Sequence, residues 1–437
     1  MSSTVVNVGI DLGVKSMHQA VGFDTEGQKI TGLIKFNTTT ADLDKLIDEL
    51  GREKQLRFMM EPTAMAWMPV AQYLLAKGYQ AFLVSAEKVH DLRKFYSKHA
   101  KNDRLDAETL ARMPFICPDA LSPPSIEDSE VNMLRRWVKM QDRLTHTIAD
   151  CKRRILDLVG FAVPKLKIDS RTIFSPIGRQ ILKEYLSPHK VKNMGHKCFK
   201  EALMPFITQE QGEAFIDAVY EALSDADMLY GDGGVLDWEG LQEEIRINIE
   251  LLEHNENALK KVGERIQVLY KSLHPSGNLE TIYGVGKETA PVYVAALSGR
   301  QFKEKGFRSF CGVIPKTKQS GYSNQKEKMT KAGPPWLRRA LYMSADTARK
   351  WDPQLARLYY QHRMRGAPHT KAICAVMARM SDRILKIFEE DRDYELQDLE
   401  GKPISSSTAK QIIKERFTVS KKTMIRQRKW NRDLISA

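Results

Sequence analysis

Four acidic side chains in the first quarter of the chain have the types and positions needed for metal-dependent chemistry: Asp11, Glu61, Asp103 and Asp106. Asp11 and Glu61 each close an apolar run that is typical of a β-strand. Asp103 and Asp106 stand three residues apart, where a helix is expected to begin, so both lie on one helix face. Acids at strand ends that face a helix can hold two divalent cations about 4 Å apart, a geometry used to cleave phosphodiesters.

The composition favours a polyanionic partner. The 437 residues include 68 Lys and Arg against 55 Asp and Glu, a net charge of +13. Nucleic acid is the first partner that this charge suggests and an acidic membrane surface the second. The length allows two to four domains, and we expect no membrane span and no signal peptide. Because the cysteines lack zinc-ligand spacing, we expect reduced, mostly buried thiols in a cytosolic protein: Cys117, Cys151, Cys198, Cys311 and Cys374.

Residues 4–113 alternate strand and helix signals. Thr39 or Thr40 is expected to open the first helix, which runs to Leu50. Three strands in succession followed by strand–helix crossovers predict a mixed sheet flanked by helices. Prolines 114, 118, 123 and 124 indicate a linker. The predicted strands are 4–11, 17–23, 29–37, 55–61 and 80–84, and the later helices are 65–77, 86–99 and 103–112.

The middle of the chain is expected to be helical. Apolar residues spaced by three or four predict a long helix, suited to a coiled-coil arm, over 125–160 and a second one over 237–273. Prolines interrupt 161–235, which gives no clear pattern. Residues 204–256 hold fourteen acids and one base. This acidic block is either a solvated helix face or a surface that avoids or mimics nucleic acid.

A second region that could take part in catalysis or phosphate binding lies at 279–339. Gly284 and Gly286 separate two expected helices, as in a helix–hairpin–helix whose backbone N–H groups bind phosphate, although an ordinary tight turn has the same pattern. A loop rich in Lys, Gly and Ser follows, which suits contacts to a nucleic-acid backbone. Its serines are either turn residues or a nucleophile activated by metal or nearby cations. The basic residues expected to bind nucleic acid are Lys316, Lys318, Lys326, Lys328, Lys331, Arg338 and Arg339.

These motifs resemble the insertion sequence one-ten family of transposases, the DEDD recombinases guided by a bridge RNA, to which the Piv-type invertases are related. The matching segments are Gly9-Ile10-Asp11-Leu12-Gly13, Met60-Glu61-Pro62-Thr63, Lys101-Asn102-Asp103-Arg104-Leu105-Asp106-Ala107, Gln319-Ser320-Gly321 and Leu337-Arg338-Arg339-Ala340. The resemblance covers roughly 1–160 and 237–365. It implies that Asp11, Glu61, Asp103 and Asp106 bind metal. It further implies that Ser320 is the strand-cleaving nucleophile, with Ser323 as the alternative.

The resemblance also implies a fold and a domain order. An α/β ribonuclease-H-like (RuvC-like) nuclease domain would occupy 1–115. A helical, coiled-coil region with an insertion near 161–235 would span 125–275. A mostly α-helical transposase domain with the serine and the helix–hairpin–helix-like element would occupy 276–390, and a basic tail 391–437.

The implied activity is metal-dependent recombination of donor and target DNA directed by a guide (bridge) RNA. Two Mg²⁺ ions, replaceable by Mn²⁺, would assist a phosphoserine intermediate. Sequence choice would come from guide–DNA pairing. The acting unit would be a homo-oligomer, a dimer of dimers, in the prokaryotic cytosol or nucleoid, with no membrane partner.

Other functions remain open at this point. A site-specific invertase would use the same chemistry. Asp11-Leu12-Gly13 also occurs in actin-like ATPases, but the chain lacks their other phosphate and adenosine motifs. A non-catalytic nucleic-acid-binding protein could use the acids only to build structure. Four aromatic residues are either stacking platforms for bases or buried core residues: Tyr322, Trp336, Tyr359 and Tyr360.

Overall fold

The computed structural model divides the chain into two units, Met1–Asp128 (the sheet unit) and Ser129–Ala437 (the helical unit), which are described separately. In the part of the chain that the structure describes, no helix is long and apolar enough to cross a membrane. The described residues are 5–63, 65–96, 103–124, 129–166, 170–207, 212–231, 236–303, 305–315, 319–320, 323–324 and 329–420.

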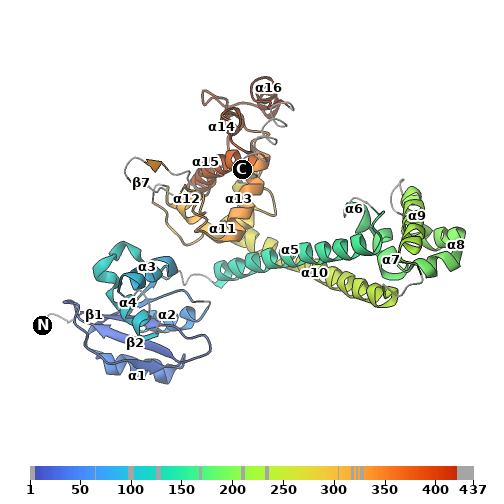
Figure 1. The fold of residues 1–437 in the computed structure, drawn as a ribbon. Coiled ribbons are helices and arrows are strands. Elements are labelled where there is room, and N and C mark those ends of the chain that lie inside the picture. The colour runs from blue at the N-terminus through green and yellow to red at the C-terminus, as the bar shows by residue number, and fades with distance from the viewer. Residues whose placement is uncertain are drawn as a thin grey trace. The chain divides into compact units, whose positions relative to one another are not determined.

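The sheet unit contains a mixed six-stranded sheet in the order β3-β2-β1-β4-β5-β6 (Figure 1). The first three strands pair antiparallel, while β1, β4 and β5 are parallel and β6 is antiparallel to β5. The predicted mixed sheet is therefore confirmed. The strands are β1 (Val5–Asp11), β2 (His18–Phe23), β3 (Ile34–Phe36), β4 (Gln55–Met60), β5 (Gln80–Val84) and β6 (Leu121–Ser122).

Helices cover both faces of this sheet. On one face, Val6, Val8 and Ile10 of β1 share a core with α1 (Thr40–Leu50) and α2 (Trp67–Ala76). On the other face lie α3 (Ala86–Tyr96) and α4 (Asp103–Ile116), which pack on residues of β2, β4 and β5. Because side chains alternate along a strand, Gly9 and Asp11 belong to the face that α4 covers.

Two boundaries in the sheet unit differ from the sequence prediction. β3 is Ile34–Phe36 and not 29–37. The backbone N–H of Gly22 in β2 donates to the side-chain hydroxyl of Thr31 at 2.8 Å. A side chain thus takes the place of a backbone carbonyl, and the ladder of backbone hydrogen bonds is interrupted there. The linker expected from Pro114 begins later, because α4 continues through Pro114 to Ile116. The expected start of α1 is confirmed: the Thr39 hydroxyl caps the helix by accepting from the Asp42 N–H at 3.1 Å.

The helical unit is built on two long helices that pack side by side, α5 (Ser129–Ala162) and α10 (Trp238–Leu273). With 34 and 36 residues they are each roughly 50 Å long. The helices are antiparallel, because the start of α5 and the end of α10 share one core while their other ends share a second. Both long helices predicted from the apolar spacing are thus present.

Each end of this helix pair has its own hydrophobic core (Figure 1). The region 161–235, which the sequence pattern did not resolve, forms the helices around one core: α6 (Ser170–Ile173), α7 (Pro176–Glu184), α8 (Pro188–Leu203) and α9 (Gly212–Tyr230). The other core holds α11 (Ala290–Leu297), α12 (Gly306–Phe310), α13 (Pro335–Ala348), α14 (Pro353–Met364) and α15 (His369–Glu390), and α16 (Ser406–Arg416) follows.

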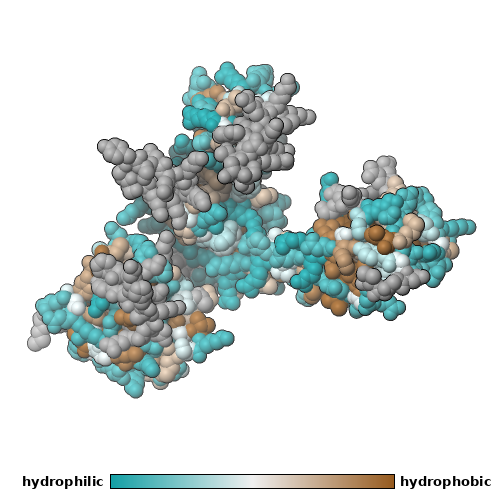
Figure 2. Space-filling model, viewed as in Figure 1, coloured by the Kyte–Doolittle hydropathy of each residue, from teal (hydrophilic) through white to brown (hydrophobic). Residues whose placement is uncertain are grey.

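Several acids of the block at 204–256 form ion pairs inside the helical unit. Glu253 of α10 pairs with Lys183 of α7 at 2.8 Å, and Glu256 pairs with Arg179 at 2.7 Å. These ion pairs favour an ordinary helix surface over a mimic of nucleic acid. Hydrophobic residues also reach the surface at the end that carries α6–α9 (Figure 2), among them Phe161, Met228 and Leu229.

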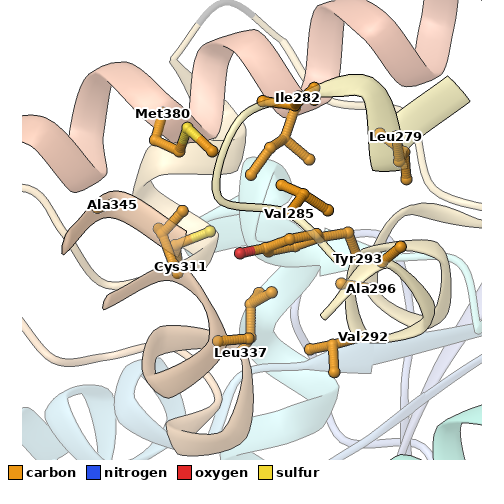
Figure 3. Close-up of a cluster of buried hydrophobic side chains, with 14 of the residues drawn as sticks. Leu279, Ile282, Val285, Val292, Tyr293, Ala296, Cys311, Leu337, Ala345 and Met380 are labelled. Atoms are coloured by element: carbon orange, nitrogen blue, oxygen red, sulfur yellow. The ribbon is translucent and has the colours of Figure 1, made fainter. Parts of the chain in front are cut away.

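The core beneath α11–α15 surrounds a fully buried tyrosine (Figure 3). The Tyr293 hydroxyl lies 2.8 Å from the Ser344 hydroxyl of α13, so its polar atom is satisfied. Cys311 lies in the same cluster, and burial raises the pKa of its thiol to about 12. That thiol is therefore an apolar packing residue at neutral pH. The expectation of mostly buried thiols was wrong for the other cysteines, because Cys198 is exposed and Cys117, Cys151 and Cys374 are only half-buried.

Candidate active site

The register of the sheet brings Asp11 and Glu61 to the same edge. β1 and β4 are parallel, and Ile10 pairs with Met60. Asp11 and Glu61 are the next residues of their chains, and adjacent strands lie about 4.8 Å apart. Both acids are half-buried. Two carboxylates, predicted as partners from separate sequence motifs, are thus neighbours at the carboxyl ends of parallel strands.

Helix α4 lies directly on β1 because Gly9 has no side chain. A Cβ at Gly9 would lie 2.0 Å from the carbonyl oxygen of Ala107 and 2.4 Å from the nitrogen of Ala111. Any larger residue would push α4 off the sheet. The sequence analysis did not identify this need for glycine at position 9. Its signals were the glycine two residues before Asp11 and the small residues Ala107 and Ala111, one turn apart.

The direction of α4 places its first turns toward the acidic edge. The Arg112 guanidinium lies 5.0 Å from the centre of the Phe23 ring, and Phe23 pairs with Asn7 early in β1. The second half of α4 therefore lies over the start of β1. The first half, which contains Asp103 and half-buried Asp106, extends toward the end of β1 where Asp11 lies.

The described side chains do not by themselves form a closed metal site. Among them, no three His, Cys, Asp or Glu residues are placed to hold a metal ion. The side chain of Asp103, one of the four predicted ligands, lies outside the described residues. The tetrad therefore stays a prediction. Its donor chemistry suits a hard divalent cation, because carboxylate oxygens are the ligands such ions prefer.

Ser320 belongs to a short β-hairpin in the helical unit. β7 (Gln319–Ser320) pairs with β8 (Ser323–Asn324), and Ser320 is opposite Ser323. A bridge between Pro315 and Met329 closes the hairpin at its base. The side chains of both serines lie outside the described residues, as do five other predicted contact residues: Lys316, Lys318, Tyr322, Lys326 and Lys328.

Close backbone contacts fix the base of this hairpin. Gly312 has φ 68°, a left-handed conformation that favours glycine, and its Cβ would lie 2.7 Å from the nitrogen of Gly333. A Cβ at Gly333 would lie 1.9 Å from the carbonyl oxygen of Phe310. The N–H of exposed Lys331 donates to the Gly312 carbonyl at 3.1 Å. The segment before the hairpin and the segment after it are therefore in contact at the hairpin base.

The two arginines assigned to nucleic acid have partners inside the protein. Arg338 donates to the carbonyl oxygens of Lys331 and Gly333 at 3.2 and 2.8 Å, which braces the hairpin base. Arg339 pairs with Asp142 at 2.9 Å and so links α13 to α5. These contacts give both side chains a structural role that the sequence did not indicate.

The expected helix–hairpin–helix differs in its first element. Only a 3₁₀ turn, η3 (Asn278–Thr281), precedes the glycines, because α10 stops before Pro275. Gly284 has φ 91°, and its Cβ would lie 2.3 Å from the carbonyl oxygen of Ser344, so packing against α13 already requires glycine there. Gly286 is exposed, and a Cβ there would meet nothing within 4 Å, but its N–H already donates to the Thr289 hydroxyl at 3.0 Å.

The aromatic residues are mainly packing residues. Tyr359 is buried, and its hydroxyl lies 2.7 Å from Nδ1 of His369. Trp336 is partly buried against the α11–α15 core. Tyr360 packs against Phe417 with the ring centres 5.8 Å apart. The buried-core interpretation is therefore the better one for these three residues.

Comparison with known proteins connects the two units to one family. A protein-family model described as a transposase, of the DEDD type, matches residues 8–164. A second, described as "Transposase IS116/IS110/IS902 family", matches residues 276–361. The chain belongs to the IS110 family of transposases. It is also 24% identical over 401 residues to the insertion element IS110 uncharacterized 43.6 kDa protein of Streptomyces coelicolor, covering 89% of this chain and 95% of that protein.

Membership of the IS110 family gives the two candidate regions a common context. The first match contains Asp11, Glu61, Asp103 and Asp106, and the second contains Ser320. An IS110 family transposase is an enzyme that cuts and rejoins DNA, and DEDD transposases generally depend on divalent metal. Helices α6–α9 and α15–α16 lie outside both matches.

Proposed function

We propose that this protein is an RNA-guided transposase in which Ser320 forms a covalent bond to DNA while four acids hold divalent metal. The acids are Asp11, Glu61, Asp103 and Asp106. The observation that supports this most is the meeting of Asp11 and Glu61 at one sheet edge, toward which the first turns of α4 extend. We assign the sheet unit to the ribonuclease-H-like (RuvC-like) class on the same resemblance.

The acidic edge fits a divalent cation by its chemistry. Asp11, Glu61 and Asp106 offer carboxylate oxygens in half-buried positions, and such oxygens are the ligands that hard divalent cations prefer. Bound Mg²⁺, as two ions and replaceable by Mn²⁺, would polarise the phosphate and stabilise the departing oxygen. The role of the carboxylates is to hold this charge at the end of β1, where the phosphodiester must lie.

The role of Ser320 is that of a nucleophile. Its Oγ forms a bond to phosphorus as one P–O bond of the strand breaks, the serine proton passes to water, and the released strand oxygen takes up a proton. A strand hydroxyl then attacks the phosphoserine, which re-forms a phosphodiester and frees Ser320. The number of phosphoester bonds is unchanged, so no nucleoside triphosphate is required.

The acids belong to the sheet unit and Ser320 to the helical unit, so the proposed chemistry needs residues of both. We propose that the two parts come from different protomers of a dimer of dimers. The guide RNA selects the DNA by base pairing, and the protein contacts the backbone through Lys316, Lys318, Lys326, Lys328 and Lys331. Sequencing of RNA that co-purifies with the full-length protein tests the guide.

The serine is tested by trapping the protein on labelled DNA under denaturing conditions. Ser320→Ala is expected to remove the covalent adduct while nucleic-acid binding is retained. Ser323 pairs directly with Ser320 in the hairpin, and the matched variant Ser323→Ala is expected to keep the adduct. An adduct that survives in Ser320→Ala and disappears in Ser323→Ala would move the nucleophile to Ser323. Asp11→Asn and Glu61→Gln are expected to prevent cleavage with either Mg²⁺ or Mn²⁺.

A further inference from the structure

A polar cavity lies between α14, α15 and the turn at 398–402, away from the Ser320 hairpin in sequence. Its volume is about 710 Å³. One face of α14 lines it, with residues spaced as successive helical turns, and a corresponding face of α15 lies opposite. The lining residues are Gln354, Arg357, Leu358, Gln361, Arg379, Asp382, Arg383, Lys386, Leu399, Glu400 and Gly401.

Some of the lining side chains already have partners inside the protein. Arg383 pairs with buried Asp352 and donates to the Gln354 side chain at 2.7 Å. Asp382 is paired with Arg308 of α12. These contacts fix α15 against α14 and α12 and neutralise an acid that would otherwise face the cavity. The walls are therefore built independently of any ligand.

Two arginines that line the cavity have no such partners among the described residues. Arg357 on α14 and Arg379 on α15 are exposed, and neither forms a hydrogen bond or ion pair within the described part of the chain. Lys386 adds a third cation, which approaches Glu390 only at 3.7 Å. Glu400 is the acid of the lining that these cations face. The cavity thus carries a local excess of positive charge that suits an anion.

The cavity also has an apolar part and a rigid rim. Leu358 and Leu399 supply apolar surface beside the arginines. The Asp398 carboxylate accepts from the N–H groups of Glu400 and Lys402 at 2.9 and 2.8 Å, which holds the turn in place. Arginine pairs with phosphate through its planar fork and stacks on bases. Charge and apolar surface together match a nucleotide better than a free inorganic anion.

We propose that this cavity binds one unpaired nucleotide of a nucleic-acid strand, with its phosphate on Arg357 and Arg379 and its base on Leu358 and Leu399. A volume of about 710 Å³ is in the range of sites that hold a single small ligand, which suits one nucleotide. The assignment rests on membership of a DNA transposase family, and it does not depend on Ser320 being the nucleophile.

Binding of labelled oligo(dT) and oligo(U) to the full-length protein, followed by fluorescence anisotropy, tests this site. The double variant Arg357→Gln/Arg379→Gln is expected to weaken binding of at least one strand roughly tenfold and to lower its salt slope by about 0.7, since the two arginines share one phosphate and each neutralised single-strand phosphate contributes about 0.7. Arg154→Gln is the control, because Arg154 is an exposed arginine of α5 outside the cavity. It is expected to change binding less than twofold.

A variant of the apolar surface separates the cavity from general electrostatics. Leu358→Ala/Leu399→Ala removes the surface proposed to contact the base without changing charge and is expected to weaken single-strand binding, whereas Glu400→Gln is expected to strengthen it. Thermal unfolding of each variant checks that the fold is kept. The difference between oligo(dT) and oligo(U) shows whether the site takes DNA or RNA.

Three outcomes would overturn the proposal. They are double-variant affinities within twofold of the original protein for both strands, an equal loss in Arg154→Gln, and competition by a poly-glutamate peptide as strong as that by oligo(dT). The last would indicate an acidic protein partner. Adduct formation measured in parallel keeps a failure here distinct from a failure of the Ser320 assignment.

Discussion

The acidic edge of the sheet unit and the base of the Ser320 hairpin are built in different ways. At the acidic edge, strand register alone makes Asp11 and Glu61 neighbours, and Gly9 lets α4 lie on the sheet. At the hairpin, the paired strands are only two residues each. Their position depends on two glycine contacts and on the Arg338 brace.

This difference indicates which part can adjust. The acids are attached to a continuous sheet whose central strands are buried on both faces, so their spacing costs much to change. The base of the hairpin depends instead on a few close contacts. Substitutions at that base are therefore expected to affect the Ser320 hairpin, whereas the spacing of the acids is set by the sheet.

The largest effect is expected at Gly9. In Gly9→Ala the new methyl group would overlap the Ala107 carbonyl, so α4 must shift from the sheet and stability should fall by about 3 kcal/mol or more. Gly32→Ala is the control, because Gly32 has open space, and it should change stability by less than about 0.5 kcal/mol. Urea unfolding followed by circular dichroism measures both. Equal stabilities would disprove the close packing of α4 on β1.

A smaller effect is expected at Gly333. Its methyl group would meet the Phe310 carbonyl, so Gly333→Ala should cost about 2 kcal/mol and should lower adduct formation more than overall folding. Gly286→Ala is matched to it, since the same methyl group there meets nothing within 4 Å. A fall in nucleic-acid affinity without a change in stability for Gly286→Ala would support its predicted phosphate contact. A stable Gly333→Ala with full adduct formation would contradict the importance of the hairpin base.

The smallest effects separate Arg338 from Lys331. Arg338→Met removes two hydrogen bonds to carbonyl oxygens and should destabilise the protein by about 1 to 2 kcal/mol. Lys331→Gln removes an exposed charge and should leave stability unchanged while lowering the salt slope of DNA binding by roughly one. Salt titrations and urea unfolding of the two variants give the comparison. The reverse pattern would make Arg338 the phosphate contact and Lys331 the structural residue.

Regular periodicity made much of the fold predictable. The long helices expected at 125–160 and 237–273 are Ser129–Ala162 and Trp238–Leu273. They were predictable because apolar residues at helical spacing indicate a helix whichever partner buries them. Residues 161–235 were harder to predict, since the short helices α6–α8 are separated by prolines and take their positions from a shared core. The buried stripe of α9, from Phe215 to Ala226, has helical spacing and was a signal that the sequence analysis missed. The partner of Arg339 was not predictable, because Asp142 lies on a distant segment.

The amino-acid sequence by itself determined the kinds of groups available: acids at strand ends, a serine in a basic loop, and helices set by the spacing of apolar residues. These depend on local chemistry and on periodicity, which need no knowledge of distant contacts. Only the tertiary structure decided that Asp11 and Glu61 are neighbours under α4, that Gly284 packs against α13, that Arg339 pairs with Asp142, and that Arg357 and Arg379 line one cavity. Such relations join segments far apart in the chain, and they arise when close packing brings those segments together.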